Sequence, residues 1–286
     1  MHQVLRIDRF ITYLATFAIF YGGKLHPRLR QAMLHRMYQF LASSRSEGWE
    51  AFDFMNYGYS ELDSKAERLK LDERDQIYRL NIQLYNHVAS GVPIRDKNVL
   101  EVGCGHGGGA SYVMRSFAPR SMVAIDLSAN NIRVCREHHP VSGLTFREGD
   151  AQNLPFEDAV FDVVLNVESS HCYPSMDRFL SEVCRVLRPG GHLLYADMKV
   201  DLQLLREQFQ RAGLNLLRQE NITPNVLKAR DEFTEQAAES IRNNMKLLSD
   251  FTLTFLGAKG TMHYKRLQKG TLTYVMCVLQ KPEPVN

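Results

Sequence analysis

The sequence predicts an α/β fold in which helices cover both faces of a mostly parallel sheet. Two observations indicate this fold. Apolar, strand-like runs alternate with helical stretches between residues 98 and 219, and the first of these runs ends in a cluster of glycines. Strands that alternate with helices form parallel sheets, and ligands of such sheets bind at the carboxyl ends of the strands. We therefore expect the functional residues to follow the strands.

Each element of this fold has its own pattern in the chain. Apolar runs rich in β-branched and aromatic residues predict strands, and apolar residues at three- and four-residue spacings predict helices. The expected strands are 98–102, 122–126, 144–148, 160–166, 192–197, 214–219 and 271–279. The expected helices of this part are 108–117, 128–137, 177–187, 206–212 and 225–245.

The composition is that of an ordinary globular protein. Of the 286 residues, 44% are hydrophobic and 23% are charged, and the net charge is +3 from 35 basic and 32 acidic side chains. This balance of charges does not indicate nucleic-acid binding, which needs a clustered basic surface. The five cysteines form no CxxC pair, so we expect neither disulfides nor a metal site. A reducing, cytoplasmic setting fits them best.

Residues 1–45 predict an N-terminal helical extension. Apolar residues follow a helical stripe from 2 to 22, Gly22 and Gly23 end it, and a second helix is expected to about residue 41. The apolar stretch 10–21 is too short to span a bilayer, and no small-residue cleavage site follows it. Two interpretations stay open. The helices pack on the body or on another subunit, forming a homo-oligomer, or their aromatic, arginine-flanked stripe makes peripheral membrane contact.

The rest of the chain divides around the alternating core, which spans 96–222. Before it, residues 46–95 contain an aromatic cluster and a helix expected at 74–90, and they predict a helical cap that contributes to the active site. After it, residues 223–270 separate the last two strands and predict a helical lid over the substrate. Residues 271–286 supply the final strand and the tail.

The glycine cluster predicts a nucleotide-like ligand. Gly103, Gly105 and Gly108 satisfy the GxGxxG pattern, with Asp126 about twenty residues on to hold a ribose, so a dinucleotide is permitted. Glu101 argues against it, because an anion beside the turn repels a pyrophosphate and favours a cationic ligand such as a sulfonium amino acid. Asp150 follows the third strand, where a carboxylate can accept a hydrogen bond from the amine of adenine.

An ordered set of motifs then resembles the class I S-adenosylmethionine-dependent methyltransferases. The set covers about 98–198 and consists of 99–107, Asp126, Gly149-Asp150, 161–166 and Arg188-Pro-Gly-Gly191. Three further runs, at 164–174, 55–59 and 270–274, resemble the phthiotriol and phenolphthiotriol dimycocerosate methyltransferases. More widely, the core is similar to sugar and macrolide O-methyltransferases of antibiotic pathways.

The resemblance implies a Rossmann-like class I methyltransferase fold with a seven-stranded sheet and S-adenosyl-L-methionine as cofactor. It also implies which residues contact that cofactor. They are Glu101, Gly103, Cys104, Gly105, Asp126, Leu127, Asp150, Ala151 and Asn166.

His171 and Asp197 are the expected catalytic residues. His171 follows the fourth strand and Asp197 ends the fifth, so the two side chains open into one cleft if these strands are neighbours. A hydroxyl nucleophile benefits from a base, and an Asp that orients a His is a familiar base. In the related sugar O-methyltransferases a similarly placed pair is the proposed base. The alternative is that His171 only caps the following helix.

The expected function is methylation of a hydroxyl on a lipid, polyketide or peptide natural product, as part of secondary metabolism. Carbon or nitrogen methylation of a small molecule and an NAD(P)-dependent oxidoreductase remain alternatives. The acceptor is a small molecule, and the candidate residues that contact it are Tyr59, Glu168, His263 and Tyr264.

Overall fold

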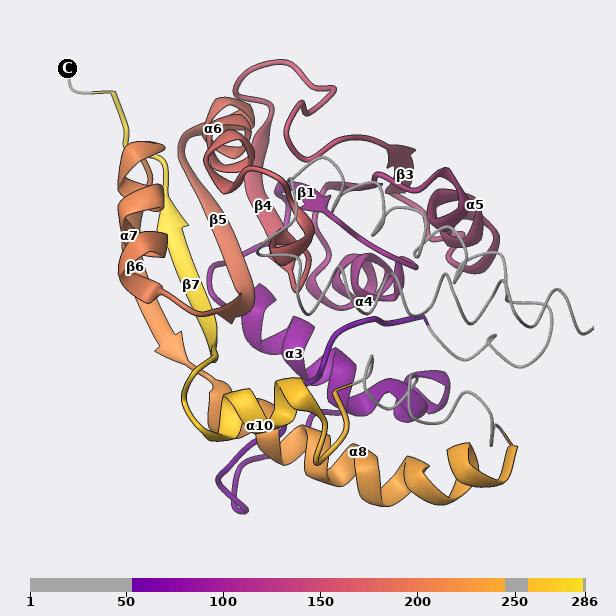
Figure 1. Ribbon diagram of the computed structural model, residues 1–286. Coiled ribbons are helices and arrows are strands. Elements are labelled where there is room, and N and C mark those ends of the chain that lie inside the picture. Colours follow the sequence, from indigo (N-terminus) through magenta and orange to yellow (C-terminus); the bar gives the residue numbers. More distant parts are fainter. Residues whose placement is uncertain (1–52, 245–256, 285–286) are drawn as a thin grey trace, which may run out of the picture.

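The computed structural model describes residues 53–244 and 257–284 (Figure 1). Its centre is a seven-stranded sheet with the strand order β3-β2-β1-β4-β5-β7-β6. The chain order reverses between β1 and β4, which places the topological switch point beside the glycine turn. The strands are β1 (Asn98–Val102), β2 (Ser121–Asp126), β3 (Leu144–Glu148), β4 (Phe161–Val167), β5 (Leu187–Lys199), β6 (Asn215–Asn221) and β7 (Thr273–Gln280).

The strand directions confirm a mostly parallel sheet. Strands β3, β2, β1, β4 and β5 pair in parallel, whereas β7 runs antiparallel to both β5 and β6. The central strands read as continuous apolar runs because helices bury both of their faces. β4 and β5 are direct neighbours, with Asn166 opposite Tyr195, so residues that follow these strands meet at one edge.

Helices pack on both faces of the sheet and give two apolar cores. One core contains side chains of α3 (Arg79–Ala89), α4 (Gly108–Phe117) and α5 (Ala129–His138). The other contains side chains of α6 (Met176–Val186) and α7 (Leu202–Arg211). The remaining described helices are two short 3₁₀ turns, η3 (Glu73–Tyr78) and η4 (Ser170–Cys172), and α8 (Thr223–Asn244) and α10 (Met262–Gln268).

One expected helix begins as a 3₁₀ turn, and two elements, β5 and α7, begin four or five residues earlier than the sequence pattern predicts. The helix expected at 74–90 starts as the 3₁₀ turn η3 before it becomes α3. β5 begins at Leu187 rather than 192, because Leu187 already pairs with Phe161 across an irregularity in β4. α7 begins at Leu202 rather than 206, since the side chain of Asp201 accepts a hydrogen bond from the Leu204 amide and caps the helix.

The segment between β6 and β7 forms α8 and α10, which contact each other and are drawn below α3 in the view of Figure 1. They lie at the end of the sheet toward which β5 and β6 point (Figure 1). The expected helices of residues 1–45 and the apolar stretch 247–256 lie outside the described residues. In the part of the chain that the structure describes, no helix is long and apolar enough to cross a membrane.

Candidate active site

The glycine turn connects the end of β1 to α4 in a conformation that needs glycine. Gly103, Gly105 and Gly107 have φ angles of 79°, 55° and 85°, in the left-handed region that residues with a Cβ rarely adopt. A Cβ on Gly103 would lie 2.5 Å from Oγ of Ser169, so the turn is also packed tightly against the end of β4. The turn therefore has a fixed shape next to the start of a helix, where backbone N–H groups attract polar ligand groups.

Asp126, at the end of β2, holds this turn in place. Its Oδ2 accepts a hydrogen bond from the Gly105 amide at 3.0 Å. Its Oδ1 accepts hydrogen bonds from the Ser128 amide at 2.9 Å and from Nδ2 of Asn131 at 3.1 Å. The expected cofactor residue thus joins the glycine turn to the strand whose carboxyl end lies beside it.

Glu101 presents an unsatisfied carboxylate oxygen at the same place. Its side chain is fully buried, Oε1 accepts a hydrogen bond from the Tyr85 hydroxyl at 2.7 Å, and Oε2 has no hydrogen-bond partner within the described residues. Burial raises the pKa of Glu101 to about 7, although the Tyr85 hydrogen bond lowers it. A buried acidic group with an unused acceptor fits a cationic ligand, as the sulfonium and ammonium groups of S-adenosylmethionine require.

Asn166 performs a structural task within the same region. It is fully buried, and its Nδ2 donates hydrogen bonds to the Val102 carbonyl at 2.9 Å and to Oγ of Ser169 at 2.8 Å. These bonds join the ends of β1 and β4, while Oδ1 of Asn166 has no partner among the described residues. The other expected cofactor residues also follow strands of this edge. Cys104 and Ala151 are buried, Asp150 accepts from the Gln152 amide, and Leu127 is exposed.

His171 and Asp197 lie in direct contact, as the sequence predicts for neighbouring strands. Nδ1 of His171 lies 2.9 Å from Oδ1 of Asp197, and the His171 amide donates to Oδ2 of the same carboxylate at 2.9 Å. Asp197 is fully buried, whereas the His171 side chain is 30% exposed. The helix that follows His171 is capped by Ser175, which accepts from the Arg178 amide, so His171 does not cap it.

The surroundings of the pair favour an ionised Asp197. Burial alone would raise the pKa of Asp197, but the charges of His171 and Lys199 and the hydrogen bonds to the carboxylate hold it below its usual value. Burial lowers the pKa of His171, while Cys172 and Asp197 raise it, and the resulting pKa lies well above the usual value. The aspartate therefore fixes the ring orientation and strengthens Nε2 as a proton acceptor.

Glu168 is the centre of a second polar cluster beside this pair. Its Oε2 accepts hydrogen bonds from the Tyr57 amide and from the Tyr274 hydroxyl, both at 2.7 Å. The hydroxyl of Tyr57 lies 2.8 Å from Nδ1 of His263. Three segments that are far apart in the chain, at 57, 168 and 263–274, thus meet next to His171.

Comparison with known proteins identifies the family. Residues 100–195 match the family model described as a methyltransferase domain. The chain is 42% identical over 233 residues to a fatty-acid O-methyltransferase of Mycolicibacterium smegmatis, covering 80% of this chain and 83% of that one. It is 39% identical over 232 residues to a phthiotriol/phenolphthiotriol dimycocerosates methyltransferase of Mycobacterium leprae, covering 80% and 85%.

The chain belongs to this methyltransferase family. S-adenosyl-L-methionine is its methyl donor, in agreement with the Glu101 site. Solved structures share the fold. The [4+2]-cyclase SpnF superposes with a TM-score of 0.67 at 21% identity, covering 88% of this chain and 96% of that one. A putative sarcosine dimethylglycine methyltransferase from Galdieria sulphuraria gives 0.65 at 19%, covering 87% and 100%.

Two residues expected to contact substrate lie outside the Glu168 cluster of the methyltransferase. The ring of Tyr59 stacks on His87, and its hydroxyl donates to Glu61. The hydroxyl of Tyr264 donates to Asp231 of α8 at 2.8 Å. Both tyrosines thus donate hydrogen bonds to residues outside the Glu168 cluster, whereas Glu168 and His263 belong to that cluster.

The sequence reasoning missed Tyr57 and Tyr274, which hold Glu168. Both belong to runs that resemble the related methyltransferases, 55–59 and 270–274. The resemblance therefore covered both tyrosines, but it gave no reason to select them from the other residues of the two runs. Tyr274 lies in the same apolar core as Tyr57, because alternate residues of β7 point to opposite faces of the sheet and both faces are buried. In the 55–59 run, Gly58 has a φ of 75°, and a Cβ there would meet the Leu80 carbonyl at 3.0 Å.

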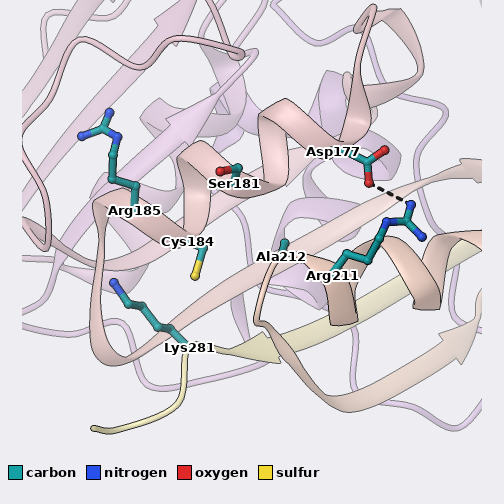
Figure 2. A pocket seen from close by; sticks show the side chains of 7 residues that line it. All are labelled: Asp177, Ser181, Cys184, Arg185, Arg211, Ala212 and Lys281. Atoms are coloured by element: carbon teal, nitrogen blue, oxygen red, sulfur yellow. Dashed lines mark hydrogen bonds and ion pairs between the residues drawn. The ribbon is translucent and has the colours of Figure 1, made fainter.

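A depression of about 410 Å³ lies on the methyltransferase away from these residues, between α6, α7 and the end of β7 (Figure 2). Its charged side chains are already paired. Arg211 donates to Asp177 at 2.9 Å, Arg185 donates to Glu182, and Lys281 donates to the Leu187 carbonyl at 2.7 Å (Figure 2 shows the first of these). None of the expected catalytic or cofactor residues lines this depression.

Proposed function

We propose that this methyltransferase methylates an oxygen atom of a lipid-like acceptor, a hydroxyl of a lipid, polyketide or peptide natural product. The observation that carries the proposal is the His171–Asp197 pair, because a hydroxyl must lose a proton when its oxygen is methylated. The two relatives whose names include a fatty acid and phthiotriol dimycocerosates support a lipid-like acceptor.

Different residues of the chain bind the methyl donor, bind the acceptor and take the proton. S-adenosyl-L-methionine supplies an activated methyl group when bound, so little bond activation is left to the protein. Glu101 and the glycine turn hold the donor, and the ends of β4 and β5 hold the acceptor beside it, which brings the reacting atoms into line. Nε2 of His171 takes the hydroxyl proton, while Asp197 stabilises the imidazolium that forms.

Carbon or nitrogen methylation is the runner-up within the same family. Such acceptors depend less on a base, so the buried Asp197 beneath His171 favours oxygen. The mass of the product and the atom that carries the new methyl group distinguish oxygen, carbon and nitrogen methylation. An NAD(P)-dependent oxidoreductase is set aside, because the family is that of methyltransferases.

Two measurements on the full chain test the proposal. S-adenosylhomocysteine should raise the melting temperature, with a stabilisation of about 2.7 kcal/mol at 100 times its dissociation constant, whereas NAD(P) should not. A long-chain alcohol incubated with S-adenosylmethionine should gain one methyl group in an ether linkage. Methylation on carbon or nitrogen, with no ether formed from any lipid alcohol, would refute the proposed acceptor.

We also propose that the enzyme is cytoplasmic and that residues 46–95 and 223–270 act as cap and lid. The five free cysteines support the first point, and the contributions of Tyr57 and His263 to the Glu168 cluster support the second. Residues 1–45 remain proposed to pack, oligomerise or contact a membrane. A chain lacking residues 1–42, compared for assembly and liposome binding, distinguishes these roles.

A further inference from the structure

The side chain of Glu101 is oriented by a helix that precedes the alternating core. Residues of β1 alternate between the two faces of the sheet, so Val99 packs in the core that contains α3, whereas Leu100 and Val102 pack in the other core. Glu101 shares the face of Val99 and therefore points toward α3. Tyr85 of that helix donates the hydrogen bond that Oε1 of Glu101 accepts, at 2.7 Å.

The ring of Tyr85 is fixed by its neighbours. Its side chain is 5% exposed, and it fills the space that Gly109 of α4 leaves open, since a Cβ on Gly109 would lie 1.9 Å from Cζ of Tyr85. The ring of Phe54 packs edge-on against it, with the two ring centres 5.9 Å apart. These contacts fix the position of the hydroxyl beside Glu101.

The hydrogen bond leaves one oxygen of Glu101 for a ligand. Oε1 is bonded to the Tyr85 hydroxyl, and Oε2 has no hydrogen-bond partner among the residues that the structure describes. A carboxylate that turned freely would present either oxygen to a ligand. Because packing and a hydrogen bond hold Oε1, Oε2 keeps a constant position next to the glycine turn.

The same bond favours the negative charge that a cationic methyl donor needs. A hydroxyl that donates to a carboxylate stabilises the ionised form. Burial raises the pKa of Glu101 to about 7, while the Tyr85 bond lowers it and the charge of Asp126 raises it. Cys104 and Glu168 are the other titratable groups that interact with Tyr85. Loss of the Tyr85 hydroxyl therefore leaves Glu101 neutral over a wider range of pH.

We propose that Tyr85 is a positioning residue for the methyl donor: its hydroxyl orients Glu101 and keeps it ionised, so that Oε2 binds the cationic part of S-adenosylmethionine. Tyr85 lies outside residues 100–195, the part that matches the methyltransferase domain model. Donor binding thus depends on segment 46–95 as well as on the core. The inference goes beyond the proposed function and holds whichever acceptor is methylated.

Binding of S-adenosylmethionine to Tyr85→Phe is the first test. The full chain is titrated by calorimetry without acceptor, from about pH 6 to 9, on both sides of the Glu101 pKa. At pH 7 the dissociation constant of the variant should be roughly tenfold higher, because a hydrogen bond to a charged group is lost. Wild-type affinity should rise as Glu101 ionises and level off above about pH 7. In the variant it should level off at a higher pH.

Tyr112→Phe is the matched control. Tyr112 of α4 is also buried, and its hydroxyl donates to Oδ1 of Asn86 in α3 at 2.8 Å. This variant therefore removes a tyrosine hydroxyl between the same two helices without affecting a carboxylate. It should bind S-adenosylmethionine as the wild type does at every pH. Because the ligand is the same for all proteins, its own titration cancels in the comparison.

The stability of the apo protein is a second test that needs no donor. A carboxyl whose pKa is raised on folding opposes folding as pH rises, and loss of the Tyr85 bond raises the pKa of Glu101 further. The melting temperature of wild type minus that of Tyr85→Phe should therefore be larger at about pH 9 than at about pH 5. The same difference measured in a Glu101→Gln background should not change with pH, and neither should that for Tyr112→Phe.

Two results would overturn the inference. A dissociation constant in Tyr85→Phe equal to that in Tyr112→Phe excludes a role in donor binding. Binding that is weaker by the same factor at every pH, with a constant difference in melting temperature, assigns Tyr85 to packing alone. If Tyr85→Phe does not fold, it is combined with Glu101→Gln, which removes the unsatisfied charge. A folded double variant supports the coupling, and an unfolded one excludes it.

Failure of the proposed function gives a different result. A wild type that methylates no lipid alcohol refutes the proposed acceptor, while the binding and melting comparisons of Tyr85→Phe still decide the role of Tyr85.

Discussion

Nδ1 of His171 lies 2.9 Å from Oδ1 of Asp197, while the amide of the same histidine donates to Oδ2 at 2.9 Å. One carboxylate thus fixes both the ring and the backbone of His171. Asp197 is itself held by the Met198 amide at 2.7 Å and by the Ser170 hydroxyl. With Nδ1 directed at Asp197, Nε2 is the nitrogen that accepts a proton in the neutral ring.

Replacing His171 with Ala should lower kcat by about 10²–10⁴-fold, the usual contribution of a general base. The dissociation constant of S-adenosylhomocysteine should stay within a factor of about two, since His171 is not part of the glycine turn or the Glu101 site. His138→Ala is the control, because His138 is an exposed residue at the end of α5. Unchanged turnover in the His171 variant would exclude its role as base.

The pH dependence of kcat should report the pKa of His171. Only the neutral ring accepts a proton, so activity is lost as pH falls through this pKa, which Asp197 and Cys172 raise above its usual value. The midpoint of the acid limb should therefore lie above about 6.5. In Asp197→Asn the midpoint should move to lower pH, and the plateau should fall by at least about 10²-fold. An acid limb at the same pH in both proteins would contradict this coupling.

The same pair makes stability depend on pH. The pKa of Asp197 is lowered on folding, so its contribution is present above the unfolded value of about 3.9 and is lost as pH falls below it. The pKa of His171 is raised, so its contribution is complete below about 6.5 and is lost as pH rises through the folded pKa. The melting temperature of wild type minus that of Asp197→Asn should be largest between about pH 4 and 6.5. A difference that is constant from acid to alkaline pH would argue against it.

Glu101→Gln should weaken binding of the cofactor and raise the stability of the apo protein. Loss of a charge-assisted contact to a cationic ligand should raise the dissociation constant of S-adenosylmethionine by roughly 10- to 100-fold. Burial raises the pKa of Glu101 to about 7, so the ionised carboxylate opposes folding as pH rises above its unfolded value. The apo variant should therefore melt at a higher temperature than the wild type at pH 8. Calorimetry with and without ligand measures both effects.

Glu182→Gln serves as the comparison. The Arg185 hydrogen bond lowers the pKa of Glu182, so its carboxylate stabilises the fold at neutral pH. This variant should melt at a lower temperature and bind S-adenosylmethionine as the wild type does. If both glutamine variants change stability in the same direction, Glu101 is not the unsatisfied acid that the structure indicates.

Gly103→Ala and Gly270→Ala separate backbone strain from crowding. Both glycines have positive φ angles, 79° and 68°. A Cβ on Gly270 meets nothing within 4 Å, whereas one on Gly103 lies 2.5 Å from Oγ of Ser169. Gly270→Ala should cost about 1–2 kcal/mol of unfolding free energy. Gly103→Ala should cost more and should also abolish binding of S-adenosylhomocysteine, as measured by denaturant unfolding and calorimetry. Equal costs and intact binding would show that the turn is not packed as described.

Local patterns were sufficient to predict the core of the sheet. The glycine turn after 98–102 and the apolar runs near 122–126 and 144–148 define β1, β2 and β3 within about one residue, because buried parallel strands are continuous apolar runs. The early starts of β5 and α7 were not predictable in this way. They depend on pairing with Phe161 and on the cap that Asp201 makes, which are contacts rather than patterns.

The sequence by itself determined the alternating α/β core, the cofactor turn and the candidacy of His171 and Asp197, because each lies at or just after the carboxyl end of a strand and all such ends of a parallel sheet share one edge. Only the tertiary structure decided that Tyr57 and Tyr274, more than two hundred residues apart, hold the same oxygen of Glu168. No local pattern encodes that meeting, since it depends on how the segment before β1 and the antiparallel β7 pack against the end of β4.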